Sequence, residues 1–157
     1  MRRTFTHTIV LAFAGSLLAV APAAQASNIG NEGCTPGYWK NHVDNWEEAT
    51  PDMTVGSIYA DAPASVADLT LEEALRAKGG SGADGASAIL VRAAVAAWLN
   101  AASEELGYPW RRMSGGLEGR PALVPTVNDA FASGDRATML ELARRLDADN
   151  NLGCDLS

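Results

Sequence analysis

The sequence is poor in the residues that most often carry catalysis or bind metals. Only two cysteines and two histidines occur among its 157 residues, and one of the histidines, His7, lies in an apolar N-terminal stretch. Structural zinc sites need four clustered Cys or His ligands, so a zinc-dependent fold is not indicated. A Gly-x-Ser-x-Gly nucleophile elbow is also missing, and any serine triad would have to use His42.

Positive charge is scarce as well. The first 26 residues hold two of the 12 basic residues and no acidic one, so ten basic residues face 19 acidic residues in the remaining chain, a formal charge of −9. Nucleic acids and anionic membranes are bound through clusters of basic residues that release counterions, and the sequence shows no such patch. We therefore expect neither of these partners.

Long apolar runs are confined to the beginning of the chain. Beyond residue 26 no run approaches the ~20 apolar residues of a membrane-spanning helix, so no span is expected. Residues 1–26 have the parts of an export signal, namely a basic start at Arg2 and Arg3, an apolar middle and a small-residue cleavage site ending at Ala26. The arginine pair fits a twin-arginine signal only partly, which favours the general secretory route. We expect a single secreted, periplasmic or cell-surface domain over residues 27–157.

The two cysteines, Cys34 and Cys154, lie near the two ends of this expected domain. In an oxidising compartment an isolated pair more often forms a disulfide than a metal site. A bridge that closes about 120 residues would contribute about 4 to 5 kcal/mol in the chain-entropy model. The sequence thus predicts one disulfide that joins the ends of the domain.

The stretch CTPGYWKNH, residues 34–42, predicts the first helix. Thr35 can cap free N–H groups, and Pro36 is suited to the first helical position. The helix is expected to continue to about Trp46, and its inward face would hold Trp39, His42, Val43 and Trp46. We interpret this stretch as a structural motif made of Thr35, Pro36, Gly37, Tyr38, Trp39, Lys40, Asn41, His42 and Trp46.

The other expected elements are helical too. A capping box at Thr70 starts a helix over residues 71–78, and an alanine-rich stripe predicts a central helix over residues 86–106, preceded by a flexible loop at residues 81–85. Two more helices are expected over residues 126–132 and 136–147, the last capped by Asp135 with Met139, Leu140, Ala143 and Leu146 inward. Residues 55–59 fit either a helical turn or a short strand. The sequence therefore predicts an all-α fold, a compact bundle of four to five helices closed by one disulfide.

Three segments carry a resemblance to a known family: Cys34 to His42, Leu90 to Ala102 and Leu146 to Cys154. They are similar to the GCTPG(F/Y)WKNH, LLRAAVAALLNAA and LD..NN.GC patterns of the CTPGYWKNH-type module of uncharacterised secreted and cell-surface bacterial proteins. The resemblance covers nearly all of residues 33–156, and Trp98 stands where the family usually has Leu. It implies an extracellular, self-contained module and supplies no catalytic residue.

His42 is the candidate for chemistry, as a general base or a metal ligand. Lys40 and Asp44 lie two residues away on the expected helix and would not face it. We favour the alternative in which His42 is a buried, hydrogen-bonded residue beneath Trp39 and Trp46.

The favoured binding residues are Tyr108, Trp110, Arg111 and Arg112. An exposed loop that combines aromatic rings with cations can form a recognition patch. The alternative is that the aromatic residues fold back as a lid on the core.

A metal or cofactor site is not expected. Residues 147–151 begin like a calcium loop, but the glycine is displaced to Gly153 and a bidentate Glu is missing. We interpret this segment as the end of the last helix.

The sequence is most consistent with a secreted or cell-surface module that has a binding or structural role and no catalysis. Its partner would be an extracellular protein or a glycan. The alternative is an extracytoplasmic hydrolase or metal-dependent enzyme centred on His42.

Overall fold

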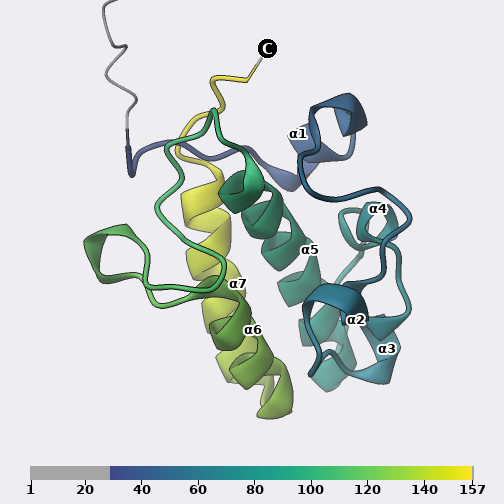
Figure 1. The fold of residues 1–157 in the computed structure, drawn as a ribbon. Helices are drawn as coiled ribbons and strands as arrows, with labels where there is room; N and C mark the ends of the chain where they lie inside the picture. Colours follow the sequence, from purple (N-terminus) through teal and green to yellow (C-terminus); the bar gives the residue numbers. More distant parts are fainter. Residues whose placement is uncertain (1–28, 157) are drawn as a thin grey trace, which may run out of the picture.

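The computed structural model describes residues 29–156, so the predicted export signal of residues 1–26 lies outside the described residues. This part of the chain contains seven α-helices, two 3-10 turns and no β-strand (Figure 1). The helices are α1 (Pro36–Trp39), α2 (Val55–Ile58), α3 (Ala64–Ala67), α4 (Leu71–Ala74), α5 (Gly82–Ala102), α6 (Leu123–Ala132) and α7 (Arg136–Asn150). The 3-10 turns are η1 (Val43–Asn45) and η2 (Leu117–Gly119). The predicted all-α class is confirmed, and the two helices beyond the expected number are α2 and α3, each a single turn of four residues.

The long helix α5 lies at the centre, with the short helices α1 to α4 on one side and α7 on the other (Figure 1). Helices α5 and α7 run in the same direction. Ser87 near the start of α5 contacts Met139 near the start of α7, and Asn100 near the end of α5 bonds Asn150 at the end of α7. The buried alanines of α5 permit this close approach of the two helices.

Helix α5 begins four residues earlier than expected. Residues 82–85 form its first turn instead of a loop, and Gly85 packs so closely on Gly80 that a Cβ atom would overlap the Gly80 backbone. The helix is long and apolar enough to cross a membrane by length and composition, a stretch that the sequence prediction overlooked. Most of it is buried against the rest of the chain, as in the core helix of a globular domain.

The first helix is much shorter than predicted. Thr35 caps it as expected, because its Oγ1 accepts a hydrogen bond from the Tyr38 N–H at 3.1 Å. The helix then ends at Trp39, since side chains bond the carbonyl groups that a continuing helix would use. Trp46 Nε1 donates to the Trp39 carbonyl at 3.0 Å, and His42 Nδ1 lies 2.9 Å from the Tyr38 carbonyl.

The remaining helix boundaries follow local capping. The capping box between Thr70 and Glu73 is present, although α4 ends at Ala74 and not at residue 78. Residues 55–58 form a helical turn. Asp135 caps α7 by accepting from the Thr138 N–H, and α7 continues three residues beyond the predicted end to Asn150. Of the residues expected inward on α7, Met139, Ala143 and Leu146 are buried and Leu140 is partly buried.

The predicted disulfide between Cys34 and Cys154 is confirmed. Beside it the Gly33 N–H donates to the Gly153 carbonyl at 2.8 Å, and a side chain at Gly33 would overlap the Asp149 carbonyl. The segment before α1 therefore lies directly on the end of α7, and the two ends of the described chain meet there (Figure 1).

We predict that loss of the bridge destabilises the fold through the unfolded state. A Cys34→Ser, Cys154→Ser double variant should lose about 4 kcal/mol in the free energy of unfolding, because the unfolded chain regains the freedom of a long loop. Urea unfolding followed by tryptophan fluorescence measures this. Thiol titration of the unfolded, unreduced protein should find no free thiol, and a result of two would contradict the bridge.

Candidate functional site

Three segments that the sequence analysis singled out, residues 34–42, 90–102 and 146–154, meet at a buried cluster of amide side chains. Asn100 is fully buried at the end of α5. Its Oδ1 accepts from the Cys34 N–H at 2.8 Å and from Trp39 Nε1 at 2.9 Å. Its Nδ2 donates to the Cys34 carbonyl and to Asn150 Oδ1, both at 2.9 Å. The amide thus uses all four of its hydrogen-bonding positions inside the protein.

Asn150 extends the cluster toward the loop after α5. Its Oδ1 also accepts from the Tyr108 hydroxyl at 2.7 Å, and its Nδ2 donates to the Ala93 carbonyl at 3.0 Å. Burial, and secondly the charge of Asp149, raise the pKa of Tyr108 well above its ordinary value. The hydroxyl therefore stays protonated and serves as a donor.

Asp149 adds an ionic branch beside the amides. Its Oδ2 accepts from Trp110 Nε1 at 2.6 Å, and Arg120 donates to both carboxylate oxygens at 2.8 and 3.2 Å. This hydrogen bonding raises the pKa of Arg120, so the guanidinium keeps its charge. Through these hydrogen bonds the Asp149 carboxylate attaches the 107–120 segment to α7.

The exposed recognition patch expected at residues 108–112 is not formed. Tyr108 and Trp110 are 0% exposed and point into the cluster just described, which is the lid alternative. Arg111 donates to the carbonyl groups of Tyr108 and Trp110 at 2.6 and 3.1 Å. The prediction of exposed rings is wrong because the core supplies hydrogen-bond acceptors for both of them.

Arg112 is also engaged within the fold. It binds Glu48 with two hydrogen bonds of 2.7 and 3.0 Å, and its guanidinium lies 5.0 Å from the centre of the Trp98 ring. These bonds lower the pKa of Glu48. Glu48 has φ of 57°, in the left-handed region that non-glycine residues rarely adopt, so the pair holds a strained turn in place.

His42 lies on the surface and not beneath the tryptophans. Its ring stacks on Tyr38 with centroids 4.1 Å apart, and Nδ1 approaches the Tyr38 carbonyl. In the described part of the chain no carboxylate lies within ion-pair distance of the imidazole. The prediction of burial is wrong because α1 ends before residue 42 and the inward face is never completed.

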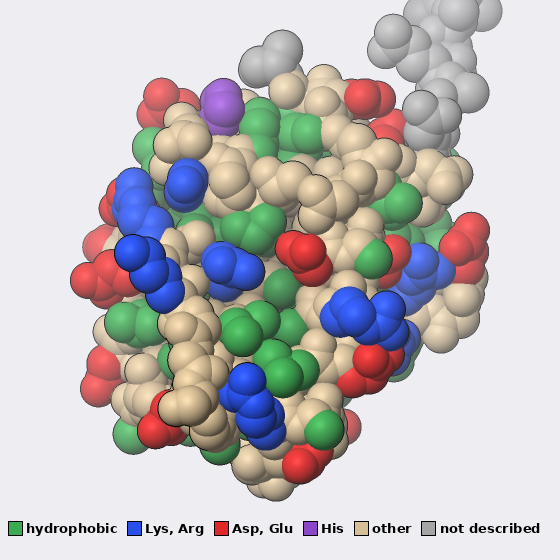
Figure 2. Space-filling model, turned by 180° about the vertical axis from the view of Figure 1, so that it is seen from behind, with side chains coloured by type: hydrophobic (Ala, Val, Ile, Leu, Met, Phe, Trp, Pro, Cys, Tyr) green, Lys and Arg blue, Asp and Glu red, His purple; other side chains and the backbone are tan. Residues whose placement is uncertain are grey.

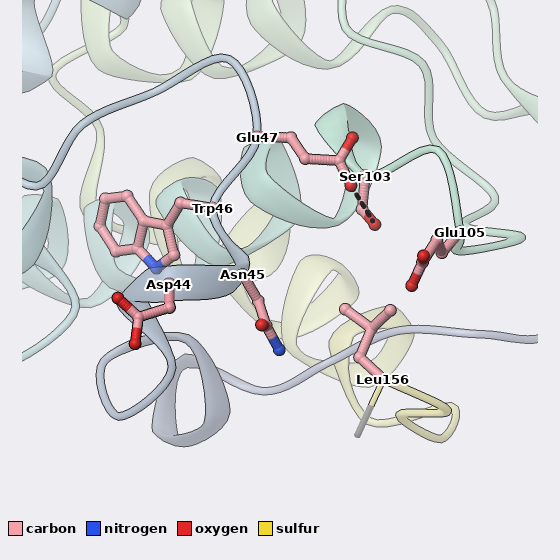
Figure 3. A pocket seen from close by; sticks show the side chains of 7 residues that line it. All are labelled: Asp44, Asn45, Trp46, Glu47, Ser103, Glu105 and Leu156. Carbon is pink, nitrogen blue, oxygen red and sulfur yellow. Dashed lines mark hydrogen bonds between the residues drawn. The ribbon is translucent and has the colours of Figure 1, made fainter.

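An acidic hollow of about 210 Å³ lies next to the first motif (Figure 3). It is lined by Asp44, Asn45, Trp46, Glu47, Ser103, Glu105 and Leu156. Glu47 accepts from Ser103 Oγ at 3.4 Å and from the Glu104 N–H at 3.1 Å, just beyond the end of α5. Figure 3 shows the Asp44 carboxylate pointing away from Glu47 and Glu105. The Asp44 carboxylate therefore forms no pair with either of the other two acids of the hollow.

A basic groove of about 560 Å³ lies on the other side of α1. Lys40, Arg76, Lys78 and Arg92 supply its cations, and Thr35, Pro36, Gly37, Leu75, Ala77, Asp147 and Asn151 complete the lining. Figure 2 shows Lys and Arg side chains gathered on the back face, on the side of α1 and α4. The sequence showed no basic patch because these four cations come from three separate segments.

The calcium-loop pattern at residues 147–151 is part of α7 and its end. Asp149 and Asn150 are buried in the cluster, and Asn151 Nδ2 bonds the Asp147 carbonyl at 2.7 Å. Among residues 29–156 no group of three or more His, Cys, Asp or Glu side chains could hold a metal ion.

Sequence reasoning missed the residues at the centre of this arrangement. Asn100 and Asn150 were not singled out, although one signal was present. Asn100 is the only side-chain amide in α5 and follows an unbroken apolar run from Ala93 to Leu99, and a polar side chain there must find partners when it is buried.

We predict that Asn100→Ala is strongly destabilising. It leaves both backbone groups of Cys34 and the indole N–H of Trp39 without partners in the core, so the free energy of unfolding should fall by about 3 kcal/mol or more. Asn41→Ala is the control, since this exposed amide bonds only the Gly37 carbonyl and its loss should cost less than about 0.5 kcal/mol. Equal midpoints in urea for the two variants would refute the central role of Asn100.

No family model, curated protein or solved structure matches this chain. The groove and the amide cluster are therefore interpreted from their own geometry.

Proposed function

We propose that this protein is an exported, disulfide-closed module that acts by binding or by structural association at the cell surface or in the surrounding medium. The observation that best supports this proposal is the buried amide cluster. The polar groups that could have served chemistry in the three motif segments are already bonded inside the fold. Asn100 and Asn150 bond each other and the backbone, and Asp149 accepts from the side chains of Trp110 and Arg120. Such a network rigidifies a scaffold and leaves its function to the surface.

The disulfide supports the extracytoplasmic part of this proposal. Such bridges form and persist mainly in oxidising compartments. The bridge also holds residue 34 against residue 154, across 120 residues of sequence. A disulfide that joins the two ends of the domain suits a module that must stay folded outside the cell.

The geometry of His42 favours binding over the alternative enzyme. A general base needs an orienting partner and a reacting group within hydrogen-bond distance. The imidazole of His42 instead stacks on Tyr38, and its Nδ1 is held by a carbonyl of the same turn. The neighbouring acids Asp44 and Glu47 line a separate hollow.

We predict that His42→Gln changes neither the stability of the protein nor any enzymatic turnover. The side chain is exposed, so the free energy of unfolding should change by less than about 0.5 kcal/mol. Assays with ester, phosphoester and peptide substrates should give no turnover that the substitution removes. Turnover by the unmodified protein that disappears in His42→Gln, or one bound metal ion per chain that the substitution releases, would instead establish the alternative enzyme.

We also predict export with cleavage after Ala26. Expressed in a bacterium with its full N-terminus, the protein should accumulate outside the cytoplasm with Ser27 as its first residue, measured by intact mass. Leu18→Arg is the control, because a charge in the apolar middle of the leader should keep the chain inside with the leader attached. Retention of the unaltered protein in the cytoplasm would contradict the proposed location.

A further inference from the structure

The basic groove gathers cations that the sequence scatters. Lys40 follows α1, Arg76 and Lys78 follow α4, and Arg92 lies in the middle of α5. Lys40 and Lys78 are the only two lysines of the entire chain. An acidic protein thus places both of its lysines and two of its arginines around one hollow.

Three of these cations have no partner within the described residues. Arg76 forms a surface ion pair with Glu72. Lys40, Lys78 and Arg92 form no side-chain hydrogen bond or salt bridge with any residue in the 29–156 range, and the carboxylate of Asp147 is the one acidic group in the lining. Three unpaired cations against one carboxylate leave the groove with an excess of two positive charges.

Of the four cations, Arg92 gives the strongest indication that the groove binds an anion. Apart from Asp84 it is the only charged residue in α5, and it is half-buried beside apolar neighbours. A partly desolvated guanidinium that faces other cations is unfavourable unless an anion compensates it. Arg92 pairs with no acidic side chain among the described residues, so no internal salt bridge accounts for its charge.

We propose that this groove binds a compact anion carrying two or more negative charges on phosphate, sulfate or carboxylate groups. This inference rests on the proposed binding function and names its ligand class. The guanidinium of Arg92 can donate a pair of parallel hydrogen bonds to such an oxyanion, and the ammonium groups of Lys40 and Lys78 add point charges around it.

The charge of the whole molecule favours a compact ligand over a long polyanion. Repulsion from the protein's other acidic groups is screened beyond about 8 Å at physiological salt, so a small anion in the groove is attracted mainly by the cations around it. A long polyanion would extend past the groove to the rest of a chain in which acidic residues outnumber basic ones. A nucleic-acid site typically uses about six to ten phosphate contacts, which exceeds the four cations present.

The two lysines provide direct reporters of the groove. Reductive ¹³C-dimethylation of the purified protein keeps the positive charge and labels Lys40, Lys78 and the N-terminal amine. Inorganic pyrophosphate, citrate and a sulfated disaccharide are then titrated and followed by ¹H–¹³C spectra, with acetate at equal ionic strength as the monovalent control. Both lysine signals should shift and saturate with at least one multivalent anion and stay in place with acetate.

Two arginine variants test the location of the site. Arg92→Gln should weaken the binding of that anion about tenfold or more while leaving the melting temperature of the ligand-free protein unchanged or raised. Arg144→Gln removes the same charge from an exposed arginine that pairs with Glu141 elsewhere on α7, and its affinity should stay within about twofold. Lysine signals that do not move with any multivalent anion, or equal losses in the two variants, would overturn the proposal.

The choice of probes separates the sources of the anion. Binding of pyrophosphate or citrate alone would identify a free small anion, and binding of the sulfated disaccharide alone would identify an anion carried on a glycan. Long-chain polyphosphate is titrated in the same way. Binding of polyphosphate alone would overturn the proposal that the ligand is a compact anion.

The same titration separates failure of this site from failure of the proposed function. Pyrophosphate that binds and remains intact in ³¹P spectra supports both. Hydrolysis of bound pyrophosphate would keep the site and overturn the non-catalytic function, whereas absence of binding would overturn the site and leave a binding surface elsewhere on the module.

Discussion

The buried amide of Asn100 is the constraint on which the rest of the structure depends. It pairs with both backbone groups of Cys34, as a neighbouring β-strand would, and so fixes an irregular segment that has no secondary structure of its own. The thiol of Cys34 is then placed for Cys154, and the indole of Trp39 is drawn into the core. A buried amide with all its partners specifies one arrangement, because any shift leaves several polar groups unsatisfied at once.

Local signals in the sequence were sufficient for the elements that they control. Thr35, Thr70 and Asp135 begin helices as predicted, since a cap depends on residues three positions away. The disulfide was predicted from the expected oxidising compartment and from the number of cysteines. The end of α1 did not follow, because it is decided by side chains that bond its carbonyl groups, and helical periodicity carries no information about that competition.

The candidate sites depended on contacts between distant residues, and here prediction from sequence failed. Tyr108 and Trp110 were open to two interpretations until Asn150 and Asp149, about 40 residues later, were seen to accept their donors. The basic groove could not be predicted from the sequence either, because its lining residues come from distant segments. The net charge of a sequence does not show where its charged residues lie in space. Folding brings four cations from three separate segments into one groove.

The parallel arrangement of α5 and α7 has a consequence for the timing of folding. The amide cluster joins residue 34 to residues 100 and 150, so it cannot close until residue 150 has been synthesised. A growing chain therefore lacks the contacts that would fix its fold early, which fits the export proposed above. The architecture that makes the finished fold rigid is thus the same one that delays its rigidity until residue 150 is in place.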